Sequence, residues 1–110
     1  MKSSVKTTDE AKFIVNQSKT QLPTLQEYTK TKETADFYKA LGDETRLRII
    51  GMLLIDNLCM CEIVDGLDIP TSTISHHLKL LERGKVIRSQ KEGRYTVYYL
   101  NKNTVLPFLK

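Results

Sequence analysis

The sequence predicts a mainly α-helical fold that carries one small β-hairpin, and three features of its second half lead to that prediction. An apolar stripe with helical spacing runs through Ile74, Leu78 and Leu81. Gly84 follows the stripe and is expected to end the helix. Beyond it, a turn at Glu92 and Gly93 precedes residues 95–100, a run of aromatic and β-branched residues typical of a strand. A helix followed by such a hairpin is the pattern of a winged helix-turn-helix.

The first half of the chain is expected to supply three helices. Residues 1–8 are predicted to be a polar tail, and residues 9–21 a helix that Pro23 interrupts. Residues 24–41 form the second predicted helix. Its apolar stripe is expected to pack rather than to bind a ligand, and it contains Leu25, Tyr28, Ala35, Tyr38 and Leu41.

The third predicted helix covers residues 44–55. Gly42 ends the helix before it, and Asp43 is suited to cap its first turn. Its apolar face is expected to contain Leu47, Ile50, Leu53 and Leu54. A short helix near residues 61–67 and a turn at 68–71 then lead to the helix that Thr71 is expected to cap, which completes the helix-turn-helix.

Length and apolar content narrow the class of protein. A chain of 110 residues is expected to form a single small core, which dimerisation would supplement. No apolar run approaches the ~20 residues of a membrane span, and the N-terminal residues lack the apolar stretch of a signal peptide. We therefore expect a cytoplasmic protein with no membrane partner, and two cysteines that are free thiols.

Positive charge gathers in the half that holds the helix-turn-helix pattern. Residues 70–110 contain 8 Lys and Arg against 2 Asp and Glu, whereas residues 1–69 contain 9 against 11. Because phosphate binding is driven by counterion release, this clustering matters more than the total charge of +4. A solvated lysine-rich surface is the plainer interpretation, but the helix and hairpin favour binding to double-stranded DNA.

The second helix of the motif has one polar side, opposite its apolar stripe. The residues on that side are expected to face the major groove, and they are Ser72, Ser75, His76, Lys79 and Arg83. Thr73 lies toward the flank and is expected to contact the DNA backbone. His77 projects nearer the apolar side, so we expect it to be partly buried and hydrogen-bonded. Lys91 and Arg94 at the hairpin tip are expected to follow phosphates or enter the minor groove.

Four sequence blocks follow one another along residues 41–100: LGDETRLRII, LCMCEIVDGL, STISHHLKLLERGKV and KEGRYTVYYL. In this order they resemble the ArsR/SmtB family of winged-helix repressors. The resemblance implies a homodimer that leaves a palindromic operator when a metal ion, a metalloid or another chemical signal arrives. It also implies dimerisation through helices at both ends of the chain.

These implications give a domain organisation. Residues 1–23 are expected to be a partly helical N-terminal extension. Residues 24–110 are expected to form the winged helix-turn-helix domain, with dimerisation helices at its two ends. The C-terminal candidate is an apolar tail that contains Val105, Leu106, Phe108 and Leu109.

Cys59 and Cys61 carry the remaining chemistry. Thiolates are soft ligands, suited to As(III), Sb(III), cadmium, lead, mercury or zinc. In a regular helix, residues two apart point about 200° away from each other, so one ion could not join both sulfurs. If Cys59 is instead an N-cap in a capping box with Glu62, the sulfurs can converge. Helix amides are then expected to lower the thiol pKa values.

The block LCMCEIV resembles the one in which arsenic-sensing and cadmium- or lead-sensing family members place ligands, and Cys59 and Cys61 match its cysteine pair. This chain has no third cysteine. A third ligand would therefore come from water, glutathione, a histidine or another chain. Residues 97–110 lack Asp, Glu and His, so we do not expect the zinc or nickel site that other members carry on their last helix. The expected inducer is As(III), Sb(III), Cd, Pb or Zn, with no permanent cofactor.

Other interpretations stay open. The cysteines could pack as core residues, or they could sense oxidation, and the regulator could then respond to a non-metal signal. A winged helix used only as a protein-interaction module would leave the polar helix face and basic wing unexplained. Catalysis is not expected, because the sequence has no glycine-rich phosphate loop, no HExxH motif and no nucleophile elbow.

Overall fold

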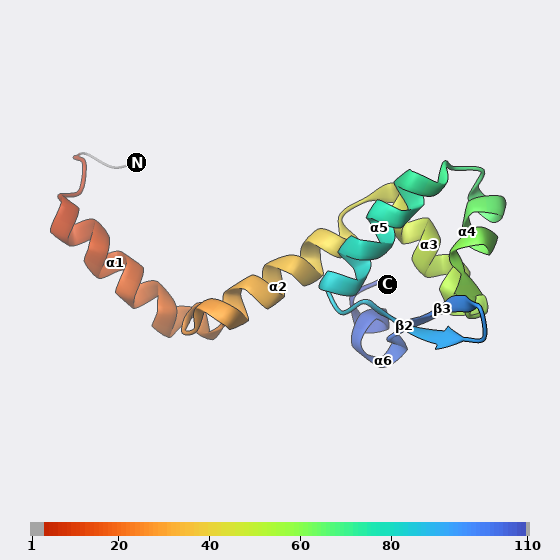
Figure 1. Cartoon of the computed structure of the whole chain (residues 1–110). Coiled ribbons are helices and arrows are strands. Elements are labelled where there is room, and N and C mark those ends of the chain that lie inside the picture. The colour runs from red at the N-terminus through yellow and green to blue at the C-terminus, as the bar shows by residue number, and fades with distance from the viewer. Residues whose placement is uncertain (1–3, 110) are drawn as a thin grey trace. The chain divides into compact units, whose positions relative to one another are not determined.

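The computed structural model describes residues 4–109, and the chain divides into two compact units, Met1–Thr34 and Ala35–Lys110 (Figure 1). The first unit contains helix α1 (Thr8–Gln21), a 3-10 turn (Pro23–Leu25) and the start of helix α2 (Tyr28–Leu41). None of its described residues is buried. The helix predicted over residues 9–21 is confirmed as α1, and the core of the protein belongs to the second unit.

The helix predicted over residues 24–41 is too long at its start. Pro23 opens a 3-10 turn instead, in which the carbonyls of Leu22 and Pro23 accept hydrogen bonds from the amides of Leu25 and Gln26 at 2.9 and 3.0 Å. Proline has a fixed φ and no amide hydrogen, so it suits the first position of such a turn. Helix α2 begins only at Tyr28.

The apolar stripe predicted on α2 packs only at its C-terminal end. Leu41 lies against the core, and the Tyr38 ring centre is 6.0 Å from that of Phe108, although Tyr38 is 54% exposed and Tyr28 is 83% exposed. The helix also buries Ala40 and packs Phe37 against the core, two residues that the prediction left out. The face that touches the core therefore only partly coincides with the predicted one.

Helix α3 (Glu44–Ile55) begins where predicted, because the Asp43 carboxylate accepts a hydrogen bond from the Arg46 amide at 3.1 Å. Its buried face differs from the prediction, since Leu47 and Leu54 are exposed. The buried residues are Arg46, Ile49, Ile50 and Leu53. They follow the spacing i, i+3, i+4, i+7, which an apolar pattern misses when its first member is an arginine.

Helices α4 (Met60–Leu67) and α5 (Thr71–Arg83) form the helix-turn-helix. The predicted stripe of Ile74, Leu78 and Leu81 is buried. The prediction that Thr71 caps α5 is wrong: Pro70 holds the cap position, and Thr71 is the first helical residue. No side chain caps this helix, and the Pro70 carbonyl accepts the amides of Thr73 and Ile74 at 3.0 and 3.1 Å.

Gly84 ends α5 as predicted, and glycine is required there mainly because the structure leaves no space for a side chain. A Cβ atom there would lie 2.7 Å from the carbonyl oxygen of Asp36 and 2.8 Å from the Cβ of Ala40. The end of α5 therefore packs directly on the backbone of α2, and only glycine allows that approach.

The predicted hairpin is confirmed as strands β2 (Ile87–Glu92) and β3 (Tyr95–Leu100). Gly93 takes a φ of +63° in the turn, where glycine is unstrained. An unpredicted strand of two residues, β1 (Leu58–Cys59), adds to β3 and gives an antiparallel sheet of order β1-β3-β2. In this register Cys59 lies opposite Val97.

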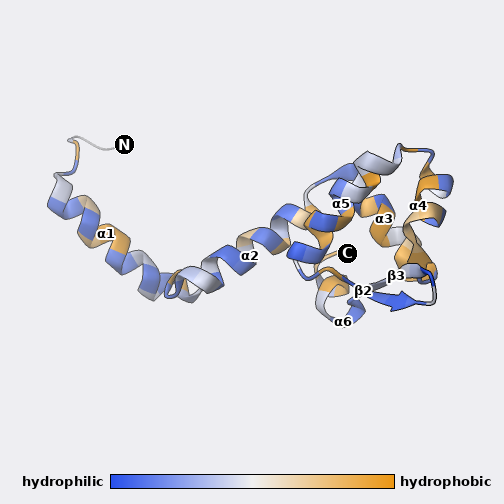
Figure 2. Cartoon of the chain, in the orientation of Figure 1, coloured by the Kyte–Doolittle hydropathy of each residue, from blue (hydrophilic) through white to orange (hydrophobic). Residues whose placement is uncertain are grey.

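Helix α6 (Lys102–Val105) and a 3-10 turn (Leu106–Phe108) follow the sheet. Apolar residues gather on α3, whereas β2 is hydrophilic beyond its first residue, Ile87 (Figure 2). Val105 of the apolar tail is fully buried in this chain, and the Phe108 ring lies 5.1 Å from that of Phe37. Within residues 4–109, no helix combines the length and apolar character that a membrane crossing requires.

Candidate nucleic-acid interface and thiol site

Helix α5 presents its polar side to solvent. Of the six contacts predicted on this helix, Ser75 is half-buried. The exposed ones are Ser72, Thr73, His76, Lys79 and Arg83. The opposite side of α5 is anchored in the core through leucine and isoleucine side chains. The structure thus brings the predicted residues to one open helix surface, where side chains of this chemistry can reach base edges and phosphates.

The hairpin carries the predicted basic tip. Lys91 and Arg94 are both exposed, and the Lys91 ammonium donates a hydrogen bond to the Arg94 carbonyl at 3.4 Å. Sequence reasoning missed a third basic residue, Arg88, whose guanidinium lies 4.5 Å from the centre of the Tyr99 ring. The strand register of the hairpin could have indicated this contact, because Arg88 and Tyr99 are directly paired across β2 and β3.

One side-chain contact lies inside the hairpin and another joins it to α5. The Tyr99 hydroxyl donates a hydrogen bond to the Glu92 carboxylate, and that bond is the main cause that raises the pKa of Tyr99. The Ser89 hydroxyl donates a hydrogen bond to the Glu82 carboxylate at 3.1 Å, which joins β2 to α5. The wing is therefore tied to α5.

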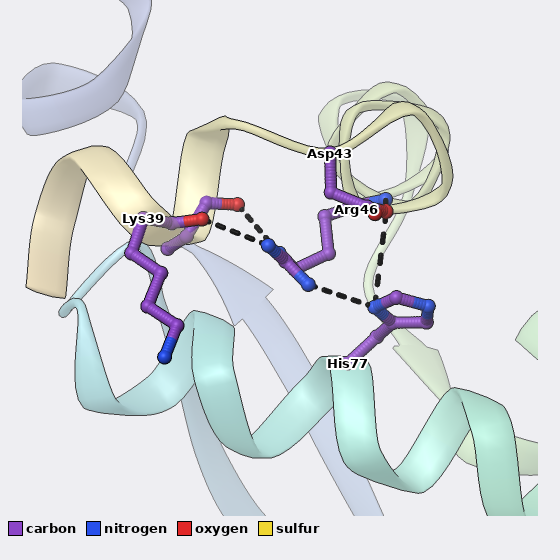
Figure 3. A network of polar contacts seen from close by, with 5 residues as sticks. Lys39, Asp43, Arg46 and His77 are labelled. Carbon is purple, nitrogen blue, oxygen red and sulfur yellow. Dashed lines mark hydrogen bonds and ion pairs between the residues drawn. The ribbon is translucent and has the colours of Figure 1, made fainter.

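A polar network centred on Arg46 joins α5 to helices α2 and α3 (Figure 3). Arg46 is only 7% exposed. Its Nε and Nη2 donate hydrogen bonds to the carbonyls of Ala40 at 2.9 Å and Lys39 at 2.8 Å, at the end of α2. Its Nη1 lies 3.0 Å from Nδ1 of His77 on α5. One arginine thus joins three helices.

His77 is partly buried and hydrogen-bonded, as predicted: its side chain is 12% exposed. An arginine can only donate hydrogen bonds, so Nδ1 must be the acceptor and the imidazole must be neutral. Burial is the main cause that lowers the pKa of His77, and Arg46 and His76 add to it. The Asp43 carboxylate, 3.8 Å from Nδ1, opposes that shift. The pKa of Asp43 is itself lowered, chiefly by the hydrogen bond from the Arg46 amide.

The cysteine pair lies at the start of α4. Cys59 is buried at the N-cap, with its amide donating to the Glu62 carboxylate at 3.0 Å, and Cys61 is exposed. The predicted capping box is therefore present. Both cysteines line the same cavity, so the two thiols face a common space.

The predicted lowering of the thiol pKa is wrong for Cys59. The hydrogen bond with Cys61 and burial both raise the pKa of Cys59, and the Glu62 amide at the helix start opposes them without prevailing. Cys59 therefore keeps its proton more firmly than an exposed cysteine does. The helix terminus acts in the expected direction, but the neighbouring thiol and the buried setting have the greater effect.

The thiols open onto a cavity of about 440 Å³ beside the wing. Its lining consists of Cys59, Cys61, Glu62, Glu92, Tyr95 and Val97. A second cavity of about 310 Å³ reaches the same cysteines from the side of Arg94 and Thr96. Among residues 4–109, no three His, Cys, Asp or Glu side chains are grouped closely enough to hold a metal ion.

A helix-turn-helix on an apolar core, joined to a basic antiparallel hairpin, defines a winged-helix DNA-binding protein. Residues 43–88 match the family model described as bacterial regulatory protein, arsR family. The chain is 38% identical over 82 residues to a helix-turn-helix-type transcriptional regulator of Methanocaldococcus jannaschii, a match that covers 74% of this chain and 92% of that protein.

Two further proteins are similar to this chain over most of its length. The cadmium resistance transcriptional regulatory protein CadC of Listeria innocua is 33% identical over 97 residues, which cover 87% of this chain and 78% of that protein. The structure of HlyU from Vibrio cholerae has a TM-score of 0.64 and 28% identity, covering 76% of this chain and 90% of HlyU. The chain belongs to the ArsR family of DNA-binding transcriptional regulators, which are not enzymes. The family predicted from the sequence blocks is confirmed.

Proposed function

We propose that this chain is a homodimeric repressor that binds a palindromic operator and leaves it when a soft metal or metalloid binds Cys59 and Cys61. The observation that carries the proposal is the position of the two thiols: both line one open cavity, at the junction of α4 with the wing. The cadmium-linked name of CadC, a relative over most of the chain, supports a soft ion.

DNA contact is assigned to the polar side of α5 and to the wing. Ser72, Ser75 and His76 carry hydrogen-bonding groups for base edges, and Thr73 lies beside them for the backbone. Lys79 and Arg83 bind phosphate or guanine, while Lys91 and Arg94 bind phosphates or enter the minor groove. One such reader covers few base pairs, so two related by a twofold axis are needed to select a palindromic site in a genome.

The exposed apolar side chains support the dimer. Phe13, Ile14, Val15 and Tyr28 are all exposed in a unit that has no buried described residue. Phe108 is exposed near the other end of the chain. A second copy of the chain would cover such surfaces. We accordingly propose that residues 1–23 are a partly helical extension of a domain at residues 24–110, which has dimerisation helices at both of its ends.

Two physical routes link the thiols to the DNA-contacting parts. Helix α4 packs against α5, so a shift of its first turn moves the recognition helix. Strand β1 is hydrogen-bonded to β3, so the same shift also moves the wing. Typical coupling free energies between two sites are about 1–3 kcal/mol, which corresponds to a change in operator affinity of about 5- to 150-fold when ligand is present.

Oxidation is the second candidate signal. The exposed thiol of Cys61 is accessible to peroxide, and its contact with Cys59 places a partner thiol beside any sulfenic acid formed. A disulfide between residues two apart is strained, so this route favours a link between subunits.

The test uses genomic fragments selected for binding to the purified protein. Bound DNA is titrated with arsenite, cadmium or peroxide, and release is followed by fluorescence anisotropy. We expect a soft ion to release the wild type and to leave a Cys59→Ser, Cys61→Ser variant bound. Release of that variant at the wild-type ligand concentration would disprove thiol sensing, and release of the wild type by peroxide alone would favour the oxidation signal.

A further inference from the structure

Both acidic side chains of residues 70–110 are held by hydroxyl groups of the hairpin. This basic half of the sequence contains two acids, Glu82 and Glu92. Glu82 accepts a hydrogen bond from the Ser89 hydroxyl at 3.1 Å, and Glu92 accepts one from the Tyr99 hydroxyl. A carboxylate repels phosphate, so the place at which the hairpin holds each carboxylate matters for DNA binding.

The strand register shows in which direction the Glu92 carboxylate is drawn. Glu92 is directly paired with Tyr95 beside the turn, whereas Tyr99 lies four residues farther from the turn on β3. An even number of positions separates the two tyrosines, so their side chains project from the same face of the sheet as that of Glu92. The hydrogen bond from Tyr99 therefore directs the Glu92 carboxylate along this face, toward the base of the hairpin and away from its tip.

Arg88 lies at the base of the hairpin, on the other side of the same tyrosine. It is paired with Tyr99 across β2 and β3, and its guanidinium is 4.5 Å from the centre of the Tyr99 ring. The hydrogen bond to Glu92 is the largest influence on the pKa of Tyr99 and raises it, whereas the charge of Arg88 lowers it. One tyrosine thus brings the negative charge of Glu92 and the positive charge of Arg88 close to each other.

The charge at the tip would differ if Glu92 turned the other way. Its neighbours along the chain are Lys91 and, beyond Gly93, Arg94, and both of these cations are exposed. Consecutive Cα atoms are about 3.8 Å apart, so a released Glu92 carboxylate can reach the space beside either cation. There it would cancel part of their charge and repel the DNA backbone.

From this geometry we propose that Tyr99 is a positioning residue for DNA binding, whose hydroxyl holds Glu92 back from the hairpin tip. The tip then presents Lys91 and Arg94 to DNA without a competing carboxylate. The inference rests on the proposed contact of the wing with DNA, and it adds a residue that acts through Glu92 rather than by touching DNA.

The experiment measures the affinity of the full-length chain for a genomic fragment selected by the wild type, using fluorescence anisotropy at several salt concentrations. Tyr99→Phe removes the hydroxyl and keeps the ring over Arg88. At low salt we expect the affinity to fall about threefold, the effect of one unit charge about 6 Å from one phosphate in water. The loss should shrink as salt is raised, because salt screens exposed charges.

Variants of Glu92 separate a positioning role from a structural one. Glu92→Gln removes the repulsive charge, so Tyr99→Phe should not weaken binding in that background. Glu92→Asp keeps the charge but shortens the side chain by one methylene. Its carboxylate should then lose Tyr99 and reproduce the threefold loss with the hydroxyl still present. The matched control is Tyr98→Phe, which removes the hydroxyl of a neighbouring tyrosine on the opposite face of β3 and should keep wild-type affinity.

The outcomes separate this inference from the function on which it rests. If Arg94→Ala binds as tightly as the wild type, the proposed wing contact fails and the role of Tyr99 fails with it. If Arg94→Ala weakens binding but Tyr99→Phe does not, the positioning role alone is rejected. It is also rejected if Tyr99→Phe loses as much affinity in the Glu92→Gln background as in the wild type. Urea denaturation checks that each variant is folded, and Glu92→Asp supplies the test if Tyr99→Phe is not.

Discussion

Two polar sites lie beside helix α5 and the wing, and they differ in how completely their polar groups are paired within the chain. Around Arg46, all three guanidinium nitrogens have partners: two carbonyls of α2 and the imidazole of His77. At the other site, Cys59 and Cys61 line an open cavity together with Glu62. The first site is closed by contacts within the chain, whereas the thiols of the second border open space.

This difference assigns separate tasks to the two sites. A saturated buried network fixes geometry, because any change leaves polar groups unpaired in the interior. An open pair of thiols can gain a partner, so it can bias one arrangement over another. The network holds α5 to α2 and α3, and the thiol site lies where β1 pairs with β3 of the wing. We therefore expect mutations at the first site to change stability, and mutations at the second to change the response.

The largest expected effect is the loss of folding stability caused by Arg46→Met. Methionine roughly keeps the volume but removes the Arg46 donor from the Ala40 carbonyl and from His77. It also removes one of two donors to the Lys39 carbonyl, which still accepts from the Gly42 amide at 3.3 Å, so we expect unfolding free energy to fall by about 2–4 kcal/mol. Urea denaturation measures it. The matched control is Arg48→Met, an exposed arginine on the same helix, which should change stability by less than about 0.5 kcal/mol. Equal effects of the two substitutions would show that the network does not anchor α5.

The network also marks what sequence reasoning could and could not predict. Helix α5, its apolar stripe and the hairpin follow from periodicity and turn residues, which are local properties of the chain. Arg46 was missed as a core residue because charge normally indicates exposure, and its partners are separated from it by up to 31 residues. Only the folded chain brings them together.

The thiol site shows a similar limit. The capping box of Cys59 and Glu62 was predictable from a spacing of three. Strand β1 was not, since two residues contain too little pattern to indicate a strand. Without β1, the sequence gives no reason to place Tyr95 and Val97 beside the cysteines, and the sign of the Cys59 pKa shift depends on that folded environment.

A smaller effect is expected from Arg94→Ala, which tests whether the wing matters for DNA binding. If this exposed charge contacts a phosphate, as proposed, its removal should weaken binding to all sequences and lower the slope of log affinity against log salt by about one. Affinity measured over a range of salt concentrations gives both numbers. Ser75→Ala is the contrasting variant, because loss of a base contact should alter sequence preference and leave the slope unchanged. If Arg94→Ala changed neither affinity nor slope, the thiol site could not act through the wing.

The smallest expected effect concerns pH and His77. Its pKa lies below the ordinary value of 6.5 in the folded protein, because burial, Arg46 and His76 outweigh Asp43. The unfolded chain therefore binds a proton at a higher pH than the folded chain, and folding stability should fall as pH drops from above 6.5 toward the lower folded pKa. His77→Gln keeps an acceptor for Arg46 but cannot titrate, so the loss of stability over this interval should shrink. Urea denaturation at steps of pH measures the change. His76→Gln leaves the contact between Arg46 and His77 intact and removes the smallest of the influences on the pKa of His77, so as the control it should reduce the loss of stability only slightly. A steeper loss of stability in His77→Gln than in the wild type would contradict a neutral imidazole at this contact.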